Sequence, residues 1–341
     1  MSRAIVALLL VALPAVALAA EYDYKLMAED WKSMECTWCG SVEQTPIDLM
    51  AEAEMGSYVQ MPMQFAPTFN LPSVTDAFVA NNGHNVNLEF ATAPGATFRF
   101  PKGSTFTSLN GEYTSFGPSD GCTTETPVAV PKSNFPPADM QNSDDEEVEA
   151  VQGTLLDLHW HVPSEHSVNG KLYAAEAHFV HFVPRPNDPD CTFGPDGDLC
   201  LAVIGVFYDL HSDLTEQQLD PGFTSVMEQV VALPDENSAD TAPNATFNFN
   251  EFLPESKEFF HYRGSLTTPG CNENVTWFVM QEPKIMGYSH WAALHDAIIY
   301  DHLGNTNARP PLPLNNRTVK VSNYEEATNP TPPAVINLPC Q

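Results

Sequence analysis

The stretch "LHWHVPSEHSVNGKLYAAEAHFVHF", residues 158–182, contains five of the 11 histidines in the chain. Histidine suits a protein core poorly unless its ring nitrogens find partners. So dense a cluster therefore indicates a metal site, a proton path or a buried polar network.

The residues around the first two histidines have the pattern of a strand, predicted over Leu156–Val162. Successive side chains of a strand point to opposite faces, so Asp157, His159 and His161 share one face. The two imidazoles then lie about 7 Å apart along the backbone. This is close enough for both to reach one ion.

A second run, residues 176–182, alternates in the same way and carries His178. Between the two runs lies Asn169-Gly170, a dipeptide that strongly favours a β-hairpin. The expected antiparallel pairing brings His178 back beside the two histidines of the first run.

Three neutral histidines without a fourth protein ligand are typical of catalytic zinc, whose remaining position stays open. We therefore expect one zinc ion per chain, held by His159, His161 and His178. Copper remains an alternative on ligand type alone.

The acidic neighbours have the spacing of groups that orient metal ligands. Glu176 is expected to accept the ring N–H of His178, and Asp157 that of His159. His166 and His181 are expected to be hydrogen-bonding groups around the site rather than ligands.

The N-terminus has the layout of a secretory signal peptide over residues 1–20, with Arg3 before an apolar run and "ALA" at 17–19. No later stretch reaches the roughly 20 apolar residues that a membrane span needs. We expect an exported, soluble protein without a membrane span, located extracellularly or in a periplasmic space.

Seven cysteines in an exported chain favour disulfides and leave one thiol over. Cys191 and Cys200 flank the turn-rich octet "TFGPDGDL", which a bridge would close into a surface loop. Cys340 is the candidate odd thiol. It would link two chains into a homodimer, or pair with Cys36 or Cys122.

The charge balance is strongly acidic, with 14 basic and 44 acidic residues and a net charge of -30. This excludes nucleic acid as a partner. Residues 139–149, "DMQNSDDEEVE", are expected to form an acidic loop. Such a surface suits either a salty medium, where screening suppresses self-repulsion, or an ordinary acidic secreted protein.

Thirty prolines and many turn residues separate short apolar runs, a pattern that predicts strands. The run "CLAVIGVFYDL", 200–210, is apolar on both faces and should be a central buried strand. Apolar residues at helical spacing predict helices over 222–233 and 289–303. The expected fold is mainly β (α+β), with a few peripheral helices packed on a sheet.

Five further segments, taken with residues 158–182, carry a family resemblance. They are "QTPIDL" (44–49), "NNGHNVNL" (81–88), "LAVIGVF" (201–207), "RGSLTTPGCNENVTWFV" (263–279) and "ARPPLPLNNRTV" (308–319). In this order they resemble the signatures of the alpha-class carbonic anhydrases, and the likeness covers most of residues 31–321.

The resemblance implies a large twisted, mostly antiparallel sheet in a single catalytic domain, residues 21–321, and reversible hydration of carbon dioxide to bicarbonate and a proton. An acidic insert near 133–149 and a loop at 184–199 exceed the family pattern. A proline-rich tail, 322–341, follows the domain.

Carried over by position, the resemblance implies the same three zinc ligands, His159, His161 and His178. It implies that Thr267 accepts the proton of a zinc hydroxide and passes its own to Glu165, and that Thr268 borders the bicarbonate site. An apolar pocket for carbon dioxide would consist of Val180, Val203, Leu266 and Trp277.

The resemblance also makes His84 a proton shuttle, with Asn82 and Asn87 ordering the water between it and the metal. A tyrosine belongs to this water network, and both Tyr22 and Tyr24 are candidates.

Further implications concern covalent features and departures from the family. The resemblance pairs Cys39 with Cys271, and the sequons at Asn244 and Asn316 are candidate glycosylation sites. Asp157 stands where the family usually has glutamine.

Two alternatives use the same fold. One is a catalytically silent binding module, and the other is a zinc esterase. Silent members typically lack a zinc histidine, whereas this chain has all three.

Overall fold

The computed structural model describes residues 22–34, 38–50, 58–69, 77–90, 95–101, 148–185, 191, 193, 199–211, 221–230, 239–241, 247–298 and 305–322. The expected signal peptide, most of the acidic insert and all of the tail beyond residue 322 lie outside these ranges. So do Cys36, Cys122, Cys340 and Asn244.

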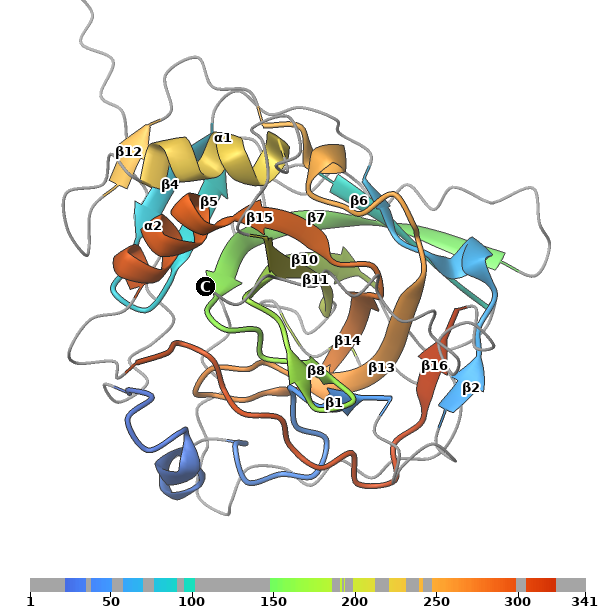
Figure 1. Cartoon of the computed structure of the whole chain (residues 1–341). Helices are drawn as coiled ribbons and strands as arrows, with labels where there is room; N and C mark the ends of the chain where they lie inside the picture. The colour runs from blue at the N-terminus through green and yellow to red at the C-terminus, as the bar shows by residue number, and fades with distance from the viewer. Residues whose placement is uncertain are drawn as a thin grey trace, which may run out of the picture.

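A large mixed sheet dominates the structure, with strands in the order β12, β4, β5, β7, β10, β11, β14, β13, β16 and β2, and with β3, β6 and β15 paired at its sides (Figure 1). The bounds are Ala239–Thr241 (β12), Ala77–Asn81 (β4), Val86–Phe90 (β5), Val148–His161 (β7), Ala175–Pro184 (β10), Leu199–His211 (β11), Glu273–Met280 (β14), Phe259–Ser265 (β13), Val319–Val321 (β16), Tyr58–Gln60 (β2), Thr68–Phe69 (β3), Gly95–Pro101 (β6) and Lys284–Gly287 (β15). This confirms the expected mainly β fold.

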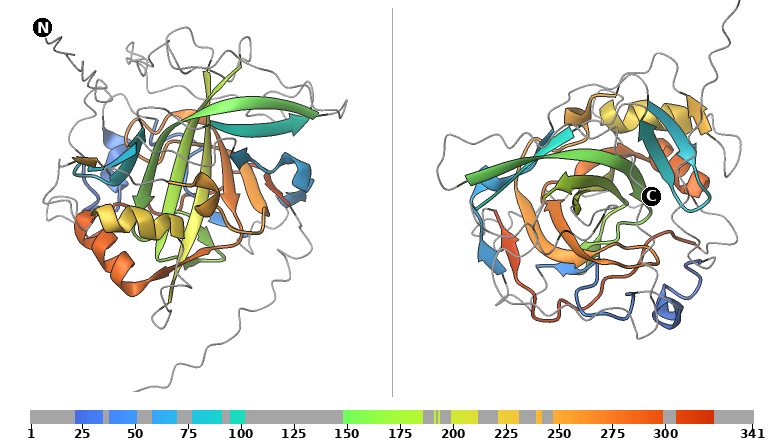
Figure 2. Two further views of the ribbon diagram at one scale, coloured as in Figure 1. Left: turned by 90° about the horizontal axis from the view of Figure 1, so that it is seen from above. Right: turned by 180° about the vertical axis from the view of Figure 1, so that it is seen from behind.

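Most pairings in the sheet are antiparallel. The exceptions in the described part of the chain are β11, which pairs in parallel with β14 and β15, and β16, which pairs in parallel with β2. Figure 2 shows from two further directions how strongly the strands twist.

Strand β11 lies in the middle of this sheet, between β10 and β14, as its two-sided apolar sequence predicts. Its side chains from residue 199 to 208 are all buried. Strand β7 starts at Val148, well before the predicted start at Leu156, because its N-terminal half pairs with β6. Strands β7, β10 and β11 therefore lie side by side in the middle of the sheet.

The Asn169-Gly170 turn joins two short strands of a separate small sheet. In this sheet β8 (Ser167–Val168) pairs with β9 (Lys171–Leu172) and with β1 (Asp48–Leu49). Both turn residues have positive φ, 50° and 74°, as the predicted hairpin turn requires. Beyond this sheet the chain returns along β10 antiparallel to β7.

The two described α-helices lie next to each other, near β4 and β5 (Figures 1 and 2). They are α1 (Pro221–Val230) and α2 (Tyr288–Ile298), which contain the described residues of the two predicted helices. Short 3-10 helices lie at Glu29–Ser33 (η1), Met63–Phe65 (η3) and Phe249–Glu251 (η5). None of the described helices is long and apolar enough to cross a membrane.

Apolar side chains form two main clusters. Successive side chains of a strand point to opposite faces of the sheet, so one strand contributes residues to both clusters. Phe179 on β10 belongs to the cluster that includes Phe223 of α1, whereas Phe182 belongs to the cluster that includes Val203 and Trp277. His178 shares the strand face of Phe182, so the histidine site lies over the second cluster.

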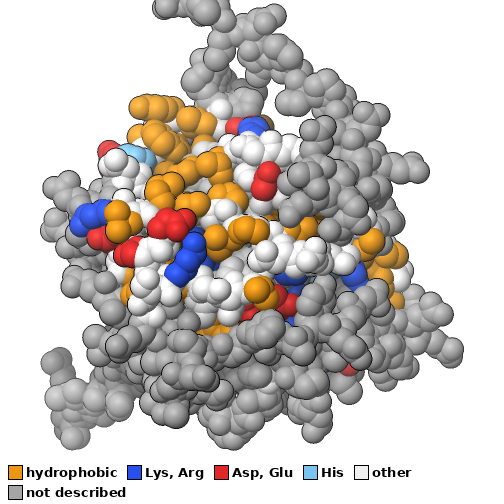
Figure 3. All heavy atoms as spheres, turned by 90° about the horizontal axis from the view of Figure 1, so that it is seen from below, with side chains coloured by type: hydrophobic (Ala, Val, Ile, Leu, Met, Phe, Trp, Pro, Cys, Tyr) orange, Lys and Arg blue, Asp and Glu red, His pale blue; other side chains and the backbone are white. Residues whose placement is uncertain are grey.

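The structure contains both expected disulfide bridges, Cys39–Cys271 and Cys191–Cys200, with Cα–Cα distances of 5.0 and 4.2 Å. Asn316 is exposed, in a turn. On the described part of the face in Figure 3, acidic and basic side chains are scattered among hydrophobic ones. The excess negative charge therefore does not gather there into one block.

Candidate metal centre

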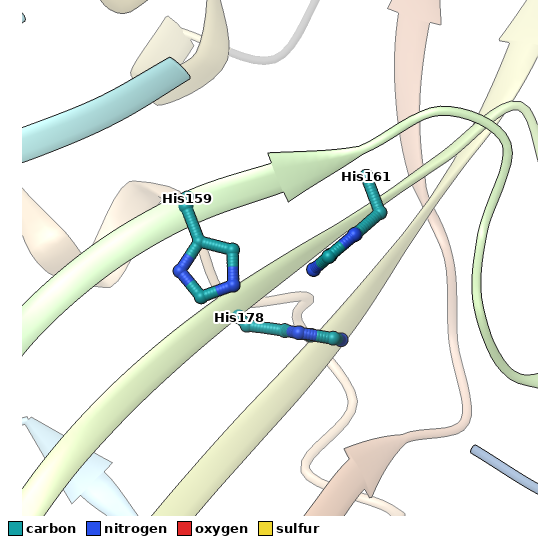
Figure 4. Close-up of side chains that lie close together, drawn as sticks. All are labelled: His159, His161 and His178. Atoms are coloured by element: carbon teal, nitrogen blue, oxygen red, sulfur yellow. The ribbon is translucent and has the colours of Figure 1, made fainter. Parts of the chain in front are cut away.

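Three histidine rings converge at the centre of the large sheet (Figure 4). His159 and His161 come from β7 and His178 from β10, where His178 pairs directly with His159. The ring centroids lie 5.0 Å (His159–His161), 5.3 Å (His159–His178) and 4.6 Å (His161–His178) apart. One nitrogen of each ring lies within 4.8 Å of the other two, which is the spacing of ligands around one ion.

A hydrogen bond on the other nitrogen of each ring fixes its orientation. The Nδ1 atom of His159 contacts a carboxylate oxygen of Asp157, and His161 Nδ1 donates to the Asn307 carbonyl at 2.8 Å. His178 Nε2 lies 3.0 Å from Glu176 Oε1. These contacts leave two Nε2 atoms and one Nδ1 atom facing the centre.

The donor set fits zinc. His161 Nε2 is buried and has no hydrogen-bond partner among the described residues, as expected of an atom whose partner is a metal. Burial lowers the pKa of His178 to about 4 and holds the pKa of His161 well below its usual range, aided by neighbouring histidines. Both rings are therefore neutral near pH 7, the state in which imidazole binds a metal.

Glu176 anchors a second layer of hydrogen bonds. Its Oε1 accepts from His166 Nδ1 at 2.7 Å, and its Oε2 accepts from the backbone N–H groups of Glu165 and His166. Burial alone would raise the pKa of Glu176, but His166 and His178 bring it below its usual range. Glu176 thus stays ionised and able to hold the His178 ring.

Of the two remaining histidines of the opening stretch, His166 lies beside the site as expected, whereas His181 lies away from it, because strand alternation turns its side chain to the other face of β10. His166 Nε2 lies 2.6 Å from the Tyr262 hydroxyl, so both of its nitrogens have partners. His181 lies on the opposite face of β10 from His178 and donates from Nδ1 to the Phe179 carbonyl at 2.9 Å.

Glu165 lies next to the candidate metal ligands His161 and His178 and is fully buried. Its Oε1 accepts from the Arg309 backbone N–H at 2.9 Å and lies 3.4 Å from His161 Nδ1. Burial raises the pKa of Glu165, while the Arg309 N–H and a hydrogen bond from the Thr267 side chain act against this rise. The structure thus brings together the pair that the resemblance links, Glu165 and Thr267.

Three of the four pocket residues form a row across neighbouring strands. Val180 on β10 pairs with Val203 on β11, which pairs with Trp277 on β14. Leu266 packs against the same cluster, and Trp277 Nε1 donates to the Ser265 carbonyl at 3.0 Å. An apolar wall therefore adjoins the histidines, since the His178 and Trp277 ring centroids are 4.8 Å apart. Thr268 is half-buried.

The expected shuttle, His84, lies in the turn between β4 and β5. The Oδ1 atom of Asn82 accepts from the His84 backbone N–H at 2.9 Å. Asn87 on β5 pairs with His159 on β7, so this hairpin lies directly beside the metal ligands. Of the two candidate tyrosines, Tyr22 stacks on the His84 ring, with centroids 4.4 Å apart.

Comparison with known proteins identifies the family. A family model described as eukaryotic-type carbonic anhydrase matches residues 130–323, more than half of the chain.

The chain belongs to the eukaryotic-type carbonic anhydrase family.

Curated carbonic anhydrases match over different lengths. Carbonic anhydrase Nec1 of Nesocodon mauritianus is 34% identical over 173 residues, or 50% of this chain and 56% of the relative. Human carbonic anhydrase 12 is 26% identical over 294 residues, or 84% of this chain. The chain spans 66% of that relative's length.

Solved structures share the fold. The alpha-carbonic anhydrase of Thermovibrio ammonificans, solved with the inhibitor sulfanilamide, has a TM-score of 0.58 and 23% identity, and the match covers 89% of this chain and all of that one. Dioscorin, solved with ascorbate, has a TM-score of 0.59 and 20% identity, and the match covers 89% of this chain and 98% of that one. At such identities the likeness concerns the fold alone.

The sequence analysis missed two residues that this carbonic anhydrase fold places at the site. Asn307 accepts from His161, and the Arg309 guanidinium donates to the Thr45 and Cys39 carbonyls, 2.8 and 3.2 Å away. Both lie at the start of the segment "NARPPLPL", most of which the sequence analysis identified through the family resemblance alone. Both residues are buried in the structure, as polar residues rarely are without a specific role. The available signal in the sequence was a polar residue next to a proline-rich run.

Proposed function

We propose that this carbonic anhydrase family member is an active zinc enzyme that catalyses the reversible hydration of carbon dioxide to bicarbonate and a proton. The observation that carries the proposal is the convergence of three histidine rings, each held by a hydrogen bond on the nitrogen that points away from the centre. Zinc bound there supplies a Lewis acid that activates water near neutral pH, for which carbonic anhydrase is itself the standard example.

The apolar wall next to His178 is the proposed binding site for carbon dioxide. Carbon dioxide carries no net charge and has no hydrogen to donate, so an apolar surface competes with water to hold it. Val180, Val203, Leu266 and Trp277 provide that surface next to His178. Thr268 would border the site of the product bicarbonate.

Thr267 and Glu165 would orient the attacking oxygen. In the proposed arrangement the Thr267 hydroxyl would donate a hydrogen bond to the Glu165 carboxylate, which would leave the Thr267 oxygen as an acceptor. The nucleophile must then donate to Thr267, and this aims its free lone pair away from Thr267 and toward the substrate. Arg309 supports the arrangement through its N–H bond to Glu165.

Each turnover also releases a proton, which must leave the buried site. An imidazole with an ordinary pKa near 6.5 exchanges protons with buffer efficiently at neutral pH. His84 is half-buried at the tip of the β4–β5 hairpin, and we assign it the shuttle role. Asn82 and Asn87 flank the path as polar groups for intervening water.

The test is stopped-flow hydration of carbon dioxide on protein whose zinc content has been measured. We expect one zinc per chain and fast hydration, both lost in His178→Ala. Thr267→Val should retain zinc and lose about 100-fold in kcat/KM, the typical cost of removing one orienting hydrogen bond.

The alternatives give different results in the same experiment. Bound zinc without hydration would favour the silent binding module. High ester turnover with poor hydration would favour the zinc esterase.

Export is part of the proposal. The two disulfides suit an oxidising compartment, and the signal-peptide pattern at residues 1–20 supplies the route. N-terminal sequencing of secreted protein should find the mature chain beginning near Ala20 or Glu21. Non-reducing electrophoresis tests the proposed Cys340-linked homodimer.

A further inference from the structure

Asn307 connects the metal ligands to the loop that carries His84. Its backbone carbonyl accepts from His161 Nδ1 at 2.8 Å. Its side-chain Nδ2 donates to the His84 carbonyl at 3.1 Å and to the Trp160 carbonyl at 3.0 Å. The side-chain Oδ1 accepts from the Val162 N–H at 2.8 Å. One fully buried residue therefore contacts both ends of the proposed proton path.

The contacts to His84 and Trp160 use the two hydrogens of one amide. An amide NH2 has two donors in a fixed plane, so both carbonyls are held at a defined separation. Trp160 lies between His159 and His161 on β7, and its carbonyl is therefore tied to the position of these ligands. The amide holds the His84 backbone against this strand.

Other contacts hold the same loop from its own side. Asn82 Oδ1 accepts from the N–H groups of His84 and Asn85, both at 2.9 Å, and the Tyr22 ring stacks on His84. These contacts shape the turn but do not link it to β7. Strand pairing joins the hairpin to the ligand-bearing strand at Asn87, which pairs with His159, and the side-chain bonds of Asn307 add a link at His84 itself.

We propose that Asn307 is a positioning residue for proton transfer, whose side-chain amide holds the His84 loop in register with the metal ligands. The inference rests on the proposed function, because His84 transfers protons only if the site releases them. Water-mediated transfer is sensitive to the span between its ends, so a loosened loop slows this step. Hydration of carbon dioxide at the metal does not involve His84 and should continue at its normal rate.

The test replaces the amide without changing its shape. Asn307→Asp keeps the acceptor for Val162 but removes both donors, and Asn307→Ser is a second variant in case the buried carboxylate prevents folding. Thr306→Val is the matched control, because it removes two hydrogen bonds in the same segment, from Thr306 Oγ1 to the Val162 carbonyl at 2.9 Å and from the Ala308 N–H to Thr306 Oγ1 at 2.8 Å, but leaves the Asn307 amide in place.

In weakly buffered zinc-loaded enzyme, we expect kcat to fall about tenfold in either Asn307 variant while kcat/KM changes by less than about twofold. Added imidazole should restore kcat, since it replaces the shuttle from solution. Zinc affinity, measured by competition with a chelator, should stay within the same twofold range. Thr306→Val should keep both kinetic parameters.

A second measurement is independent of activity. The ring signals of His84, assigned with His84→Ala, should shift or broaden in the NMR spectrum of either Asn307 variant and not in Thr306→Val. Unchanged ring signals, or a parallel fall of kcat and kcat/KM without imidazole rescue, would overturn the proposal. A wild-type protein without hydration activity would refute the proposed function instead, and the NMR comparison would still test the positioning role.

Discussion

Asp157 places a carboxylate against the outer nitrogen of the metal ligand His159, at a position where glutamine is usual in the resembling family. A carboxylate partner makes the imidazole a better electron donor than an amide does. A zinc ion held by His159 would then bind more tightly and would acidify a water molecule less. Asp157 should therefore increase the affinity of the site for zinc and make a water molecule bound to that zinc less acidic.

We predict that Asp157→Gln releases zinc about tenfold faster and moves the pH midpoint of kcat/KM to a lower value. The sign follows from charge, because removing a nearby negative charge favours proton loss at the metal. Chelator-induced zinc release and a pH series of hydration rates measure both effects. Asp209→Asn, which removes a surface carboxylate paired with Lys171 at 3.0 Å, is the control and should change neither.

Two strands each contain a buried histidine that has no part in the proposed reaction. His181 on β10 donates to the Phe179 carbonyl, and His261 on β13 donates to the Trp277 carbonyl, both at 2.9 Å. Burial lowers the pKa of each to about 3, with Lys320 adding to the effect at His261. Both rings therefore stay neutral in the folded protein between about pH 3 and 6.5. In the unfolded chain, where the pKa of a histidine is near 6.5, the same two rings take up protons over this pH range.

These histidines make the free energy of unfolding depend on pH. Between about pH 3 and 6.5 the unfolded chain binds more protons, so stability is complete above this range and falls as the pH is lowered through it. We predict that His181→Asn and His261→Asn each flatten this dependence by at most about 1.4 kcal/mol per pH unit. Urea unfolding from pH 7 to 5 measures the slope, and an unchanged slope in both variants would contradict the prediction. His295→Asn, on α2, is the control.

Local patterns predicted the elements around the site well. Alternation over residues 156–162 and 176–182 identified β7, β10 and the convergence of their histidines, because a period of two fixes which side chains share a face. The Asn169-Gly170 turn and the central position of β11 followed from residue type alone.

Contacts between residues far apart in the sequence could not be predicted from local patterns. Asn307 contacts His161 and His84 across 146 and 223 residues, and no local periodicity encodes such a bond. The choice between Tyr22 and Tyr24 depended on which ring reaches His84, and this is a property of the folded chain. The roles of the site residues in catalysis remain predictions.

On the scale of the whole molecule, the Cys39–Cys271 bridge joins the N-terminal segment to the loop that follows Thr267 and Thr268. It closes 232 residues, whereas Cys191–Cys200 closes 9. Loop entropy predicts losses in unfolding free energy of about 5 kcal/mol for Cys39→Ser with Cys271→Ser, and about 2.5 kcal/mol for the other pair. Urea denaturation tests this order, and an equal or reversed ranking would show that loop length is not the controlling quantity.

The net charge of -30 leads to a prediction about salt. Like charges spread over a folded surface repel one another and destabilise the compact state, and salt screens this repulsion, with a Debye length that shrinks from about 30 Å at 0.01 M to about 3 Å at 1 M. Melting temperature should therefore rise with sodium chloride over this range while hydration activity persists, because the substrate is uncharged.

A variant with Asp144, Asp145, Glu146 and Glu147 replaced by their amides separates repulsion from a general effect of salt. It removes four negative charges from one acidic run, so its melting temperature in dilute buffer should exceed that of the wild type, and the two should converge in molar salt. A steep loss of activity or stability in molar salt would exclude adaptation to a salty medium. The ordinary acidic secreted protein would then be the better description of this surface.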